Sequence, residues 1–344
     1  MTESASQRAA ALLEVAGLRV SFAIPSGVWQ QRRVQAVDGV DITVAPGETV
    51  GLVGESGSGK STLARGIAQL VPTSGGTVRF QGEEWSSLPP AQLRARRRDL
   101  QLIFQDPLAS LNPRLSVGET LQEPLKIFQP GMDAAARRQA VESMLVRVGL
   151  APEDARRYPR QFSGGQCQRI GIARAMMPAP RLLICDEAVS ALDVSIQGQI
   201  VNLLLDLQRT AGTAMIFISH NLGIVRHVSH RVYVMFRGRI VEQAPGDALF
   251  ATPRHPYTRE LLAAVPHFGP EGDLAARIAP PAPSAAVSSA PDRASAAAWE
   301  SEPGPGCAYR HRCPHAAPVC AERSPPLQPA GPGRWAACLR LAQI

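Results

Sequence analysis

Residues 54–61 form the segment G-E-S-G-S-G-K-S, which follows a short apolar run and precedes a helical pattern. Glycines at these spacings let the backbone curl so that successive N–H groups point at phosphate oxygens, and the following helix adds its positive end. Lys60 can then reach the β- and γ-phosphates of a nucleotide, and Ser61 can ligate Mg²⁺. The segment predicts a nucleoside triphosphate site, and the alternative is a glycine-rich turn that binds nothing. The predicted phosphate-binding residues are Gly54, Glu55, Ser56, Gly57, Ser58, Gly59, Lys60, Ser61 and Thr62.

Lysine is rare in this chain, which makes Lys60 informative. The sequence holds two lysines, Lys60 and Lys126, while 36 residues are lysine or arginine. Where charge alone is needed, the chain therefore uses arginine. A lysine in the glycine loop indicates a position that requires a compact ammonium rather than a planar guanidinium.

Two adjacent carboxylates, Asp186 and Glu187, follow the apolar run at 181–185. Asp186, at the end of the expected strand, can hold Mg²⁺ through water, and Glu187 can polarise an attacking water as a general base. The alternative is an ordinary strand followed by an acid that caps a helix. The phosphate loop upstream favours the catalytic interpretation.

A second glycine-containing segment, S-G-G-Q at 163–166, stands directly before a helical run at 170–177. Ser163 is a good N-cap, and the two glycines leave backbone amides exposed at the start of the helix, where an anion can bind. The alternative is a capped helix without a ligand. One nucleotide does not need two such helix ends in one chain, unless two chains face each other.

The expected elements that position these residues alternate between strands and helices. Half-buried strands are predicted at 12–22 and 34–44, and buried or short strands at 49–53, 100–104, 181–185, 213–219, 231–235 and 239–242. Helices are predicted at 61–70 and 194–208, and residues 90–180 are expected to be mostly helical apart from the strand at 100–104. This alternation predicts an α/β core with a largely parallel sheet.

The order of these motifs resembles the nucleotide-binding domain of ABC transporters. The motifs are the glycine loop at 54–61, Gln105, the segments at 163–166 and 190–193, the pair Asp186-Glu187, and His220. The resemblance covers residues 12 to about 265. It implies a P-loop NTPase fold with a RecA-like core, an antiparallel β subdomain and a helical subdomain at about 106–178.

The resemblance also implies roles for individual residues. Gln105 matches the glutamine that touches Mg²⁺ and the attacking water and couples to membrane subunits, and His220 matches the histidine that contacts the γ-phosphate. Ser163, Gly165 and Gln166 match the signature that meets the nucleotide of an opposite subunit. The implied catalytic residues are Glu187, His220 and Gln105, and the implied Mg²⁺ ligands are Ser61, Gln105 and Asp186.

One further residue adds to this match, and two features depart from it. Asp193 corresponds to the loop that communicates between the two nucleotide sites. Ala188 stands where members of this group usually have a proline directly after the catalytic glutamate, and we expect it to loosen the turn that aims Glu187. Phe22 and Trp29 are the alternatives for the aromatic side chain that stacks on adenine.

Further segments resemble oligopeptide and dipeptide importers, namely 104–113, 163–174, 190–197 and H-P-Y-T at 255–258. This resemblance implies an ATPase subunit that pairs with a second, related ATPase subunit in a heterodimer beneath two membrane-spanning permease subunits, supplied by an extracytoplasmic substrate-binding protein. Nickel or a sugar remain alternative cargoes. The alternative functions are a soluble ABC-type ATPase that acts on nucleic acid or ribosomes, and a regulatory subunit that binds ATP without hydrolysing it.

The C-terminal part of the chain has a different composition. Residues 266–305 are rich in proline, alanine and serine, which predicts a linker, and residues 306–344 hold Cys307, Cys313, Cys320 and Cys338. Four thiols on one intracellular segment predict a metal site. The wide spacing favours a [4Fe–4S] cluster, with zinc as the second choice and four free thiols as the third.

Charge and hydropathy set the expected location. No run of about 18 uninterrupted apolar residues is present, and a basic stretch of the secretory type does not precede the apolar patch near the N-terminus. The net charge is +7, but the arginines are scattered, so nucleic acid is not expected as a partner. We expect a peripheral protein on the cytoplasmic face of the inner membrane.

Overall fold

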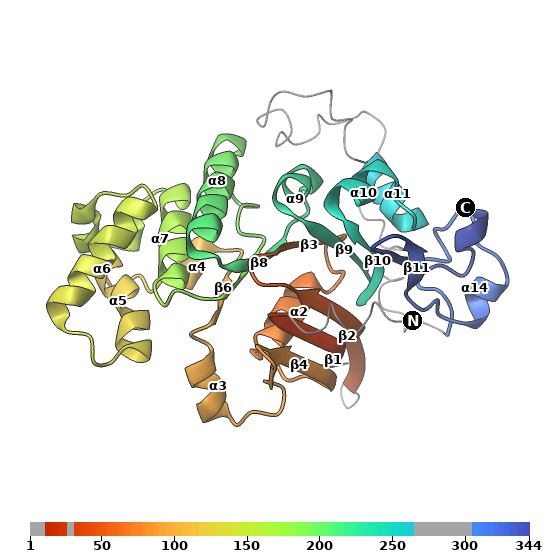
Figure 1. Cartoon of the computed structure of the whole chain (residues 1–344), viewed down its shortest axis with the longest axis horizontal. Coiled ribbons are helices and arrows are strands. Elements are labelled where there is room, and N and C mark those ends of the chain that lie inside the picture. Colours follow the sequence, from red (N-terminus) through yellow and green to blue (C-terminus); the bar gives the residue numbers. More distant parts are fainter. Residues whose placement is uncertain (1–10, 26–30, 265–304) are drawn as a thin grey trace.

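A computed structural model of the protein describes residues 11–25, 31–264 and 305–344. The strands of this part form two sheets, one of four strands and one of eight. Figure 1 shows the larger sheet running across the middle of the molecule, with α8 (Val194–Ala211) and α9 (Leu222–Val228) on one side and the smaller sheet on the other. The two sides bury separate hydrophobic clusters against the larger sheet.

The larger sheet has the order β11-β12-β10-β9-β3-β8-β7-β6, and its strands from β9 to β6 are parallel. Every residue of β3, β7 and β8 is buried, as expected for parallel strands covered on both faces. The carboxyl ends of these strands therefore meet at one edge of the sheet, where ligands bind in open α/β folds. The parallel strands are β3 (Thr49–Val53), β6 (Leu100–Ile103), β7 (Leu182–Asp186), β8 (Ala214–Ile218) and β9 (Arg231–Phe236).

The smaller sheet is antiparallel and has the order β2-β1-β4-β5. Its inner face packs against α2 (Lys60–Ile67), where Leu63 and Ile67 join the same buried cluster as Leu18 and Val20. This packing fixes the helix whose first residue is Lys60. The four strands are β1 (Leu13–Pro25), β2 (Gln31–Val44), β4 (Gly75–Phe80) and β5 (Glu83–Glu84).

A helical region occupies the end of the molecule beyond β6 (Figure 1). Leu121, Leu145 and Ile170, from three of its helices, are fully buried in one hydrophobic cluster. Within residues 100–180, only β6 interrupts the helical pattern, as predicted. The helices of this region are α4 (Pro107–Ser110), α5 (Val117–Phe128), α6 (Ala134–Arg147) and α7 (Gly164–Met176), with 3₁₀ turns at Pro152–Arg156 and Pro159–Gln161. Helix α3 (Pro90–Arg96) precedes β6 and lies apart from them (Figure 1), and its Leu93 belongs to the buried cluster of the smaller sheet.

The C-terminal residues extend the larger sheet at its opposite end. Strand β12 pairs with β10 in an antiparallel register that places Ala336 beside Glu242 and Trp335 beside Gln243. The cysteine-bearing segment, residues 306–344 and here called the cysteine module, therefore contributes strands to the sheet. This end comprises β10 (Arg239–Pro245), α10 (Gly246–Ala251), α11 (Pro256–Ala263), α14 (Val319–Glu322), β11 (Gln328–Gly331), β12 (Arg334–Ala336) and the 3₁₀ turn Leu341–Gln343.

The predicted α/β core with a largely parallel sheet is confirmed. The helix predicted at 61–70 ends earlier, at Ile67, because Ala68 closes it and Gln69 adopts a left-handed backbone with φ of 52°. The strands predicted at 12–22 and 34–44 are longer than expected and form a hairpin. The linker predicted at 266–305 lies, apart from Pro305, outside the described residues.

Candidate functional site

The glycine loop joins the carboxyl end of β3 to α2, in the strand-loop-helix arrangement that the sequence predicts. Two of its glycines are required by space as well as by conformation. A Cβ atom on Gly54 (φ 154°) would lie 2.1 Å from the Met235 carbonyl oxygen, and one on Gly59 (φ 104°) would lie 2.3 Å from the Ala36 carbonyl oxygen. The loop is therefore held between β9 and the smaller sheet.

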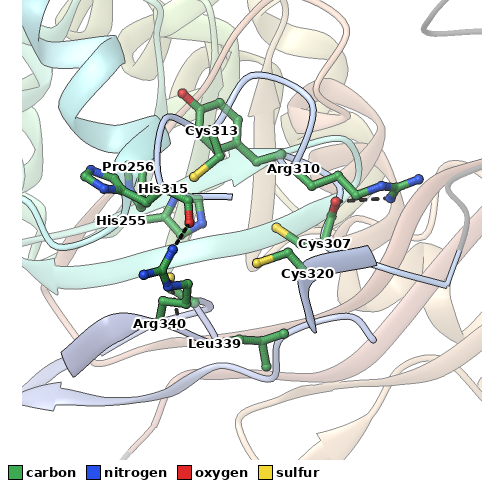
Figure 2. Close-up of a pocket in the computed structure, with 11 residues that line it drawn as sticks. His255, Pro256, Cys307, Arg310, Cys313, His315, Cys320, Leu339 and Arg340 are labelled. Carbon is green, nitrogen blue, oxygen red and sulfur yellow. Dashed lines mark hydrogen bonds between the residues drawn. The ribbon is translucent and has the colours of Figure 1, made fainter. Parts of the chain in front are cut away.

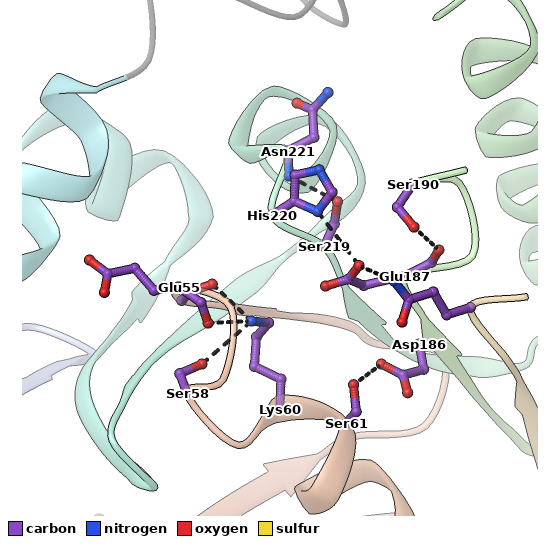
Figure 3. Close-up of polar contacts among 12 residues, drawn as sticks. Glu55, Ser58, Lys60, Ser61, Asp186, Glu187, Ser190, Ser219, His220 and Asn221 are labelled. Carbon is purple, nitrogen blue, oxygen red and sulfur yellow. Dashed lines mark hydrogen bonds and ion pairs between the residues drawn. The ribbon is translucent and has the colours of Figure 1, made fainter. Parts of the chain in front are cut away.

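Lys60 is buried at the start of α2, with 5% of its surface exposed. Its ammonium donates hydrogen bonds to the carbonyl oxygens of Gly54 at 2.8 Å and Glu55 at 2.9 Å (Figure 3). Burial lowers the pKa of Lys60 below its ordinary value, while the carboxylates of Glu187 and Asp186 oppose that shift. The two carboxylates at the end of β7 thus act directly on the lysine of the loop.

Asp186 lies at the end of β7, buried beside the loop. Its Oδ1 accepts a hydrogen bond from the Ser61 hydroxyl at 2.8 Å (Figure 3). Burial raises the pKa of Asp186, although the bond from Ser61 acts in the opposite direction. A carboxylate and a hydroxyl in contact supply the oxygen donors that Mg²⁺ prefers, so this pair fits the predicted metal ligands.

Glu187 collects two polar groups from other elements at its carboxylate. Gln105 Nε2, from the residues after β6, donates to Glu187 Oε2 at 3.0 Å. His220 Nδ1, from the residues after β8, lies 3.7 Å from the same oxygen (Figure 3). The His220 imidazole lowers the pKa of Glu187, and that carboxylate in turn raises the pKa of His220. Three predicted catalytic residues are thus in contact.

The signature segment lies at the start of α7, where Ser163 and Gln166 form a capping box. Ser163 Oγ accepts from the Gln166 N–H at 3.3 Å, and Gln166 Oε1 accepts from the Ser163 N–H at 3.0 Å. A Cβ atom on Gly165 would lie 2.8 Å from Ile196 of α8, so glycine allows close helix packing. Ser163 and Gly164 are exposed, and the described residues show no hydrogen bond between the signature and the phosphate loop. Within the chain, the signature lies at the start of α7 and the phosphate loop at the start of α2.

Comparisons with known proteins agree with this geometry. The family model described as ABC transporter matches residues 37–190, and the one described as oligopeptide/dipeptide transporter, C-terminal region, matches residues 241–320. The oligopeptide transport ATP-binding protein OppF of Escherichia coli (strain K12) is 47% identical over 332 residues, covering 92% of this chain and 92% of that protein. The chain belongs to the ABC transporter family.

Two further matches widen this comparison. The glutathione import ATP-binding protein GsiA of Escherichia coli (strain K12) is 55% identical over 259 residues, which cover 74% of this chain and 41% of that protein. A solved dimer of the ATP-binding cassette MJ0796, bound to ADP and Pi, has a TM-score of 0.62 and 27% identity, covering 68% of this chain and 98% of that one. The predicted ABC nucleotide-binding fold is confirmed.

Of the two aromatic residues predicted as candidates for stacking on adenine, the structure describes one. Phe22 lies on β1 with 40% of its surface exposed. Trp29 lies outside the described residues.

Among the described residues, no helix has both the length and the apolar character needed to cross a membrane.

Sequence reasoning missed two residues that contact the phosphate loop of this ABC protein. The Glu55 N–H donates to the Tyr257 hydroxyl of α11 at 2.9 Å, and the Glu55 carboxylate accepts from the guanidinium of Arg312 in the cysteine module. Tyr257 belongs to the H-P-Y-T segment, whose resemblance to peptide importers predicts no contact with the loop. Nothing in the sequence indicated a contact over the 257 residues that separate Glu55 from Arg312.

The four C-terminal cysteines line one pocket together with His255 and His315 (Figure 2). Burial raises the pKa of Cys307, and the neighbouring cysteines raise it further. Within the described part of the chain, however, no group of three or more histidine, cysteine, aspartate or glutamate side chains is arranged to hold a metal ion. The predicted zinc or iron–sulfur site therefore has no support from donor geometry.

Proposed function

We propose that this chain binds and hydrolyses ATP to drive the import of oligopeptides or dipeptides by an ABC transporter. The observation that carries the proposal is the contact of Gln105 and His220 with the Glu187 carboxylate, beside the buried ammonium of Lys60. A general base and a phosphate-binding cation at one edge of a parallel sheet are suited to nucleotide hydrolysis.

Each residue has a defined part in this proposal. Lys60 and the amides of the glycine loop would bind the β- and γ-phosphates. Mg²⁺, which Ser61, Asp186 and Gln105 would hold, supplies positive charge against those phosphates. Glu187 would accept the proton of the attacking water, and its lowered pKa keeps it ionised for that purpose. His220 would contact the γ-phosphate.

The exposed signature indicates how many chains a complete site needs. Ser163 and Gly165 would meet the nucleotide held by a second ATPase subunit, and the dimeric relative MJ0796 supports this arrangement. We propose a heterodimer on the cytoplasmic face of the inner membrane, under two permease subunits that receive cargo from an extracytoplasmic binding protein. The importers OppF and GsiA support a peptide cargo.

A transport experiment tests this function. The chain is reconstituted in proteoliposomes with the ATPase, permease and binding-protein subunits encoded beside its gene, and ATP-driven uptake of a labelled tripeptide is measured. Uptake that needs ATP and competes with unlabelled peptides, but not with Ni²⁺ or sugars, is expected. ATP hydrolysis stimulated by RNA or ribosomes instead of the permease would identify a soluble ABC ATPase. Bound ATP without hydrolysis would identify a regulatory subunit.

For the cysteine module we propose a [4Fe–4S] cluster, because Cys307, Cys313, Cys320 and Cys338 line one pocket and cysteine thiolates are the ligands of such clusters. Iron and acid-labile sulfide in anaerobically purified protein, at about four each per chain, would support the cluster. Zinc at one per chain, or four titratable thiols without metal, would contradict it.

We also propose domain limits at 12–265 for the nucleotide-binding domain, 266–305 for the linker and 306–344 for the module.

A further inference from the structure

The cysteine module reaches the phosphate loop through one side chain, Arg312. Its guanidinium donates from Nη1 to Glu55 Oε2 at 3.0 Å and from Nη2 to Glu55 Oε1 at 2.9 Å. Glu55 directly follows Gly54 in the loop. Paired, parallel bonds of this kind between guanidinium and carboxylate fix orientation as well as distance. The module therefore holds the side chain of a loop residue in a defined position.

Glu55 is also held by its backbone, and one of its contacts leads to the phosphate-binding lysine. Its N–H donates to the Tyr257 hydroxyl at 2.9 Å, and its carbonyl oxygen accepts from Lys60 Nζ at 2.9 Å. A displacement of Glu55 would therefore move an acceptor of the Lys60 ammonium. The chain of contacts from the module to that ammonium consists of two side chains and one peptide group.

The residues that hold Glu55 and Arg312 are themselves held by packing and hydrogen bonds. Tyr257 is fully buried and lies against Phe236, with ring centroids 4.6 Å apart, and against Tyr309 of the module at 5.6 Å. Glu260 of α11 accepts from both the Tyr309 hydroxyl and the Arg312 guanidinium. Arg312 is thus held by Glu260 of α11 as well as by Glu55 of the loop.

We propose that Arg312 is a positioning residue for the phosphate loop, so that the cysteine module sets the affinity of the ATPase for its nucleotide. This inference rests on the proposed function, since it concerns the same nucleotide site. The Arg312 guanidinium donates to Glu55 and Glu260, neither of which is a proposed catalytic residue. It acts through Glu55 on the loop and on Lys60, while Gln105, Glu187 and His220 lie on other elements. The affinity for ATP should therefore depend on Arg312 more than the hydrolytic step does.

The test compares Arg312→Ala with the matched control Arg323→Ala, which removes an exposed arginine of the same module that has no contact with the loop. Calorimetry with MgATP measures the dissociation constant, and steady-state hydrolysis in the complete transporter separates KM from kcat. We expect Arg312→Ala to weaken binding and raise KM about 3–10-fold, with a smaller change in kcat, as for loss of one charge-assisted contact that is partly exposed. The control should match the wild type. Arg312→Lys should recover only part of the loss in affinity. Its ammonium keeps the positive charge but cannot make the paired contact with the Glu55 carboxylate.

Two further measurements keep the inference falsifiable. If Arg312→Ala lowers the melting temperature, Glu55→Gln decides, since it weakens the same contact from the loop side and leaves the module intact. Glu55→Gln should raise KM similarly, and adding Arg312→Ala to it should raise KM no further. Wild-type KM in both folded variants, or additive effects in the double variant, would overturn the inference. Failure of the wild-type chain to bind MgATP would instead overturn the proposed function.

Discussion

Glu187 occupies a backbone conformation that residues with a Cβ rarely adopt, with φ of 48°. Such a conformation costs about 1–2 kcal/mol, so other contacts must hold it. The Glu187 N–H donates to the Ile218 carbonyl oxygen at 3.0 Å, and its own carbonyl oxygen accepts from the Ser190 hydroxyl at 3.0 Å. Ala188, where the family resemblance leads one to expect proline, is buried in the adjoining core. Hydrogen bonds on both sides therefore aim this carboxylate without a proline ring.

Replacing this carboxylate with an amide tests its role as a general base. Glu187→Gln preserves the shape of the side chain, so ATP should bind with near wild-type affinity. Hydrolysis should fall about 10²–10⁴-fold, because the amide cannot accept the proton of the attacking water. Binding and turnover are measured on one preparation, with the exposed Glu142→Gln on α6 as the control. Wild-type turnover in Glu187→Gln would contradict the assignment.

The pair formed by His220 and Glu187 predicts a specific titration. The Glu187 carboxylate raises the pKa of His220, so the imidazole stays protonated to a higher pH than an ordinary histidine. The attraction between the Glu187 carboxylate and the His220 imidazolium is fully present at pH values above the lowered pKa of Glu187 and below the raised pKa of His220. It is lost as the pH rises through the pKa of His220. In Glu187→Gln, the pKa of His220 should fall toward its ordinary value. An NMR titration of the imidazole signals, assigned with His220→Gln, measures this, and an unchanged His220 curve would count against the contact.

At the scale of elements, the predictions succeeded where a local pattern carried the information. The apolar run 49–53 followed by the glycine loop identifies β3 to the residue, because a buried parallel strand needs few neighbours in sequence to be recognised. Strands β11 and β12 were missed, since Pro329 and Gly331 are unfavourable in strands and the partner of β12, β10, lies about ninety residues earlier in the chain. The contacts of Glu55 with Tyr257 and Arg312 were missed for the same reason, because both partners are distant in the sequence.

Helix α7 supports a prediction about assembly, because its exposed N-terminus presents Ser163. Ser163→Arg removes the cap and places a bulky cation where a second subunit is proposed to bring its nucleotide. Binding of ATP to the isolated chain should change little, whereas hydrolysis at the partner's phosphate loop in the assembled transporter should be lost. Ser163→Thr, which retains a capping oxygen, should stay close to wild type. Loss of ATP binding by the isolated Ser163→Arg chain would mean that the signature acts within one chain.

At the scale of the whole molecule, the cysteine module covers a sheet edge and is tied to the core by a buried charge. Strand β12 pairs with β10, so β10 has no free edge over the paired residues. Arg334 Nη2 of β12 lies 3.7 Å from Glu242 Oε1 of β10, and both side chains are less than a tenth exposed. Glu242 also accepts from the backbone N–H groups of Arg254 and His255, each at 2.8 Å. The module, β10 and the start of α11 therefore share one carboxylate.

This arrangement predicts that the module and the core unfold together and that Arg334 stabilises both. Arg334→Leu removes the cation but leaves the Glu242 carboxylate buried, which should cost about 3 kcal/mol of the free energy of unfolding. Urea denaturation of the full chain measures the loss, with Arg323→Leu on the exposed surface of the module as the matched control. A midpoint for Arg334→Leu equal to that of the control would show that the module does not depend on this ion pair for its attachment to the sheet.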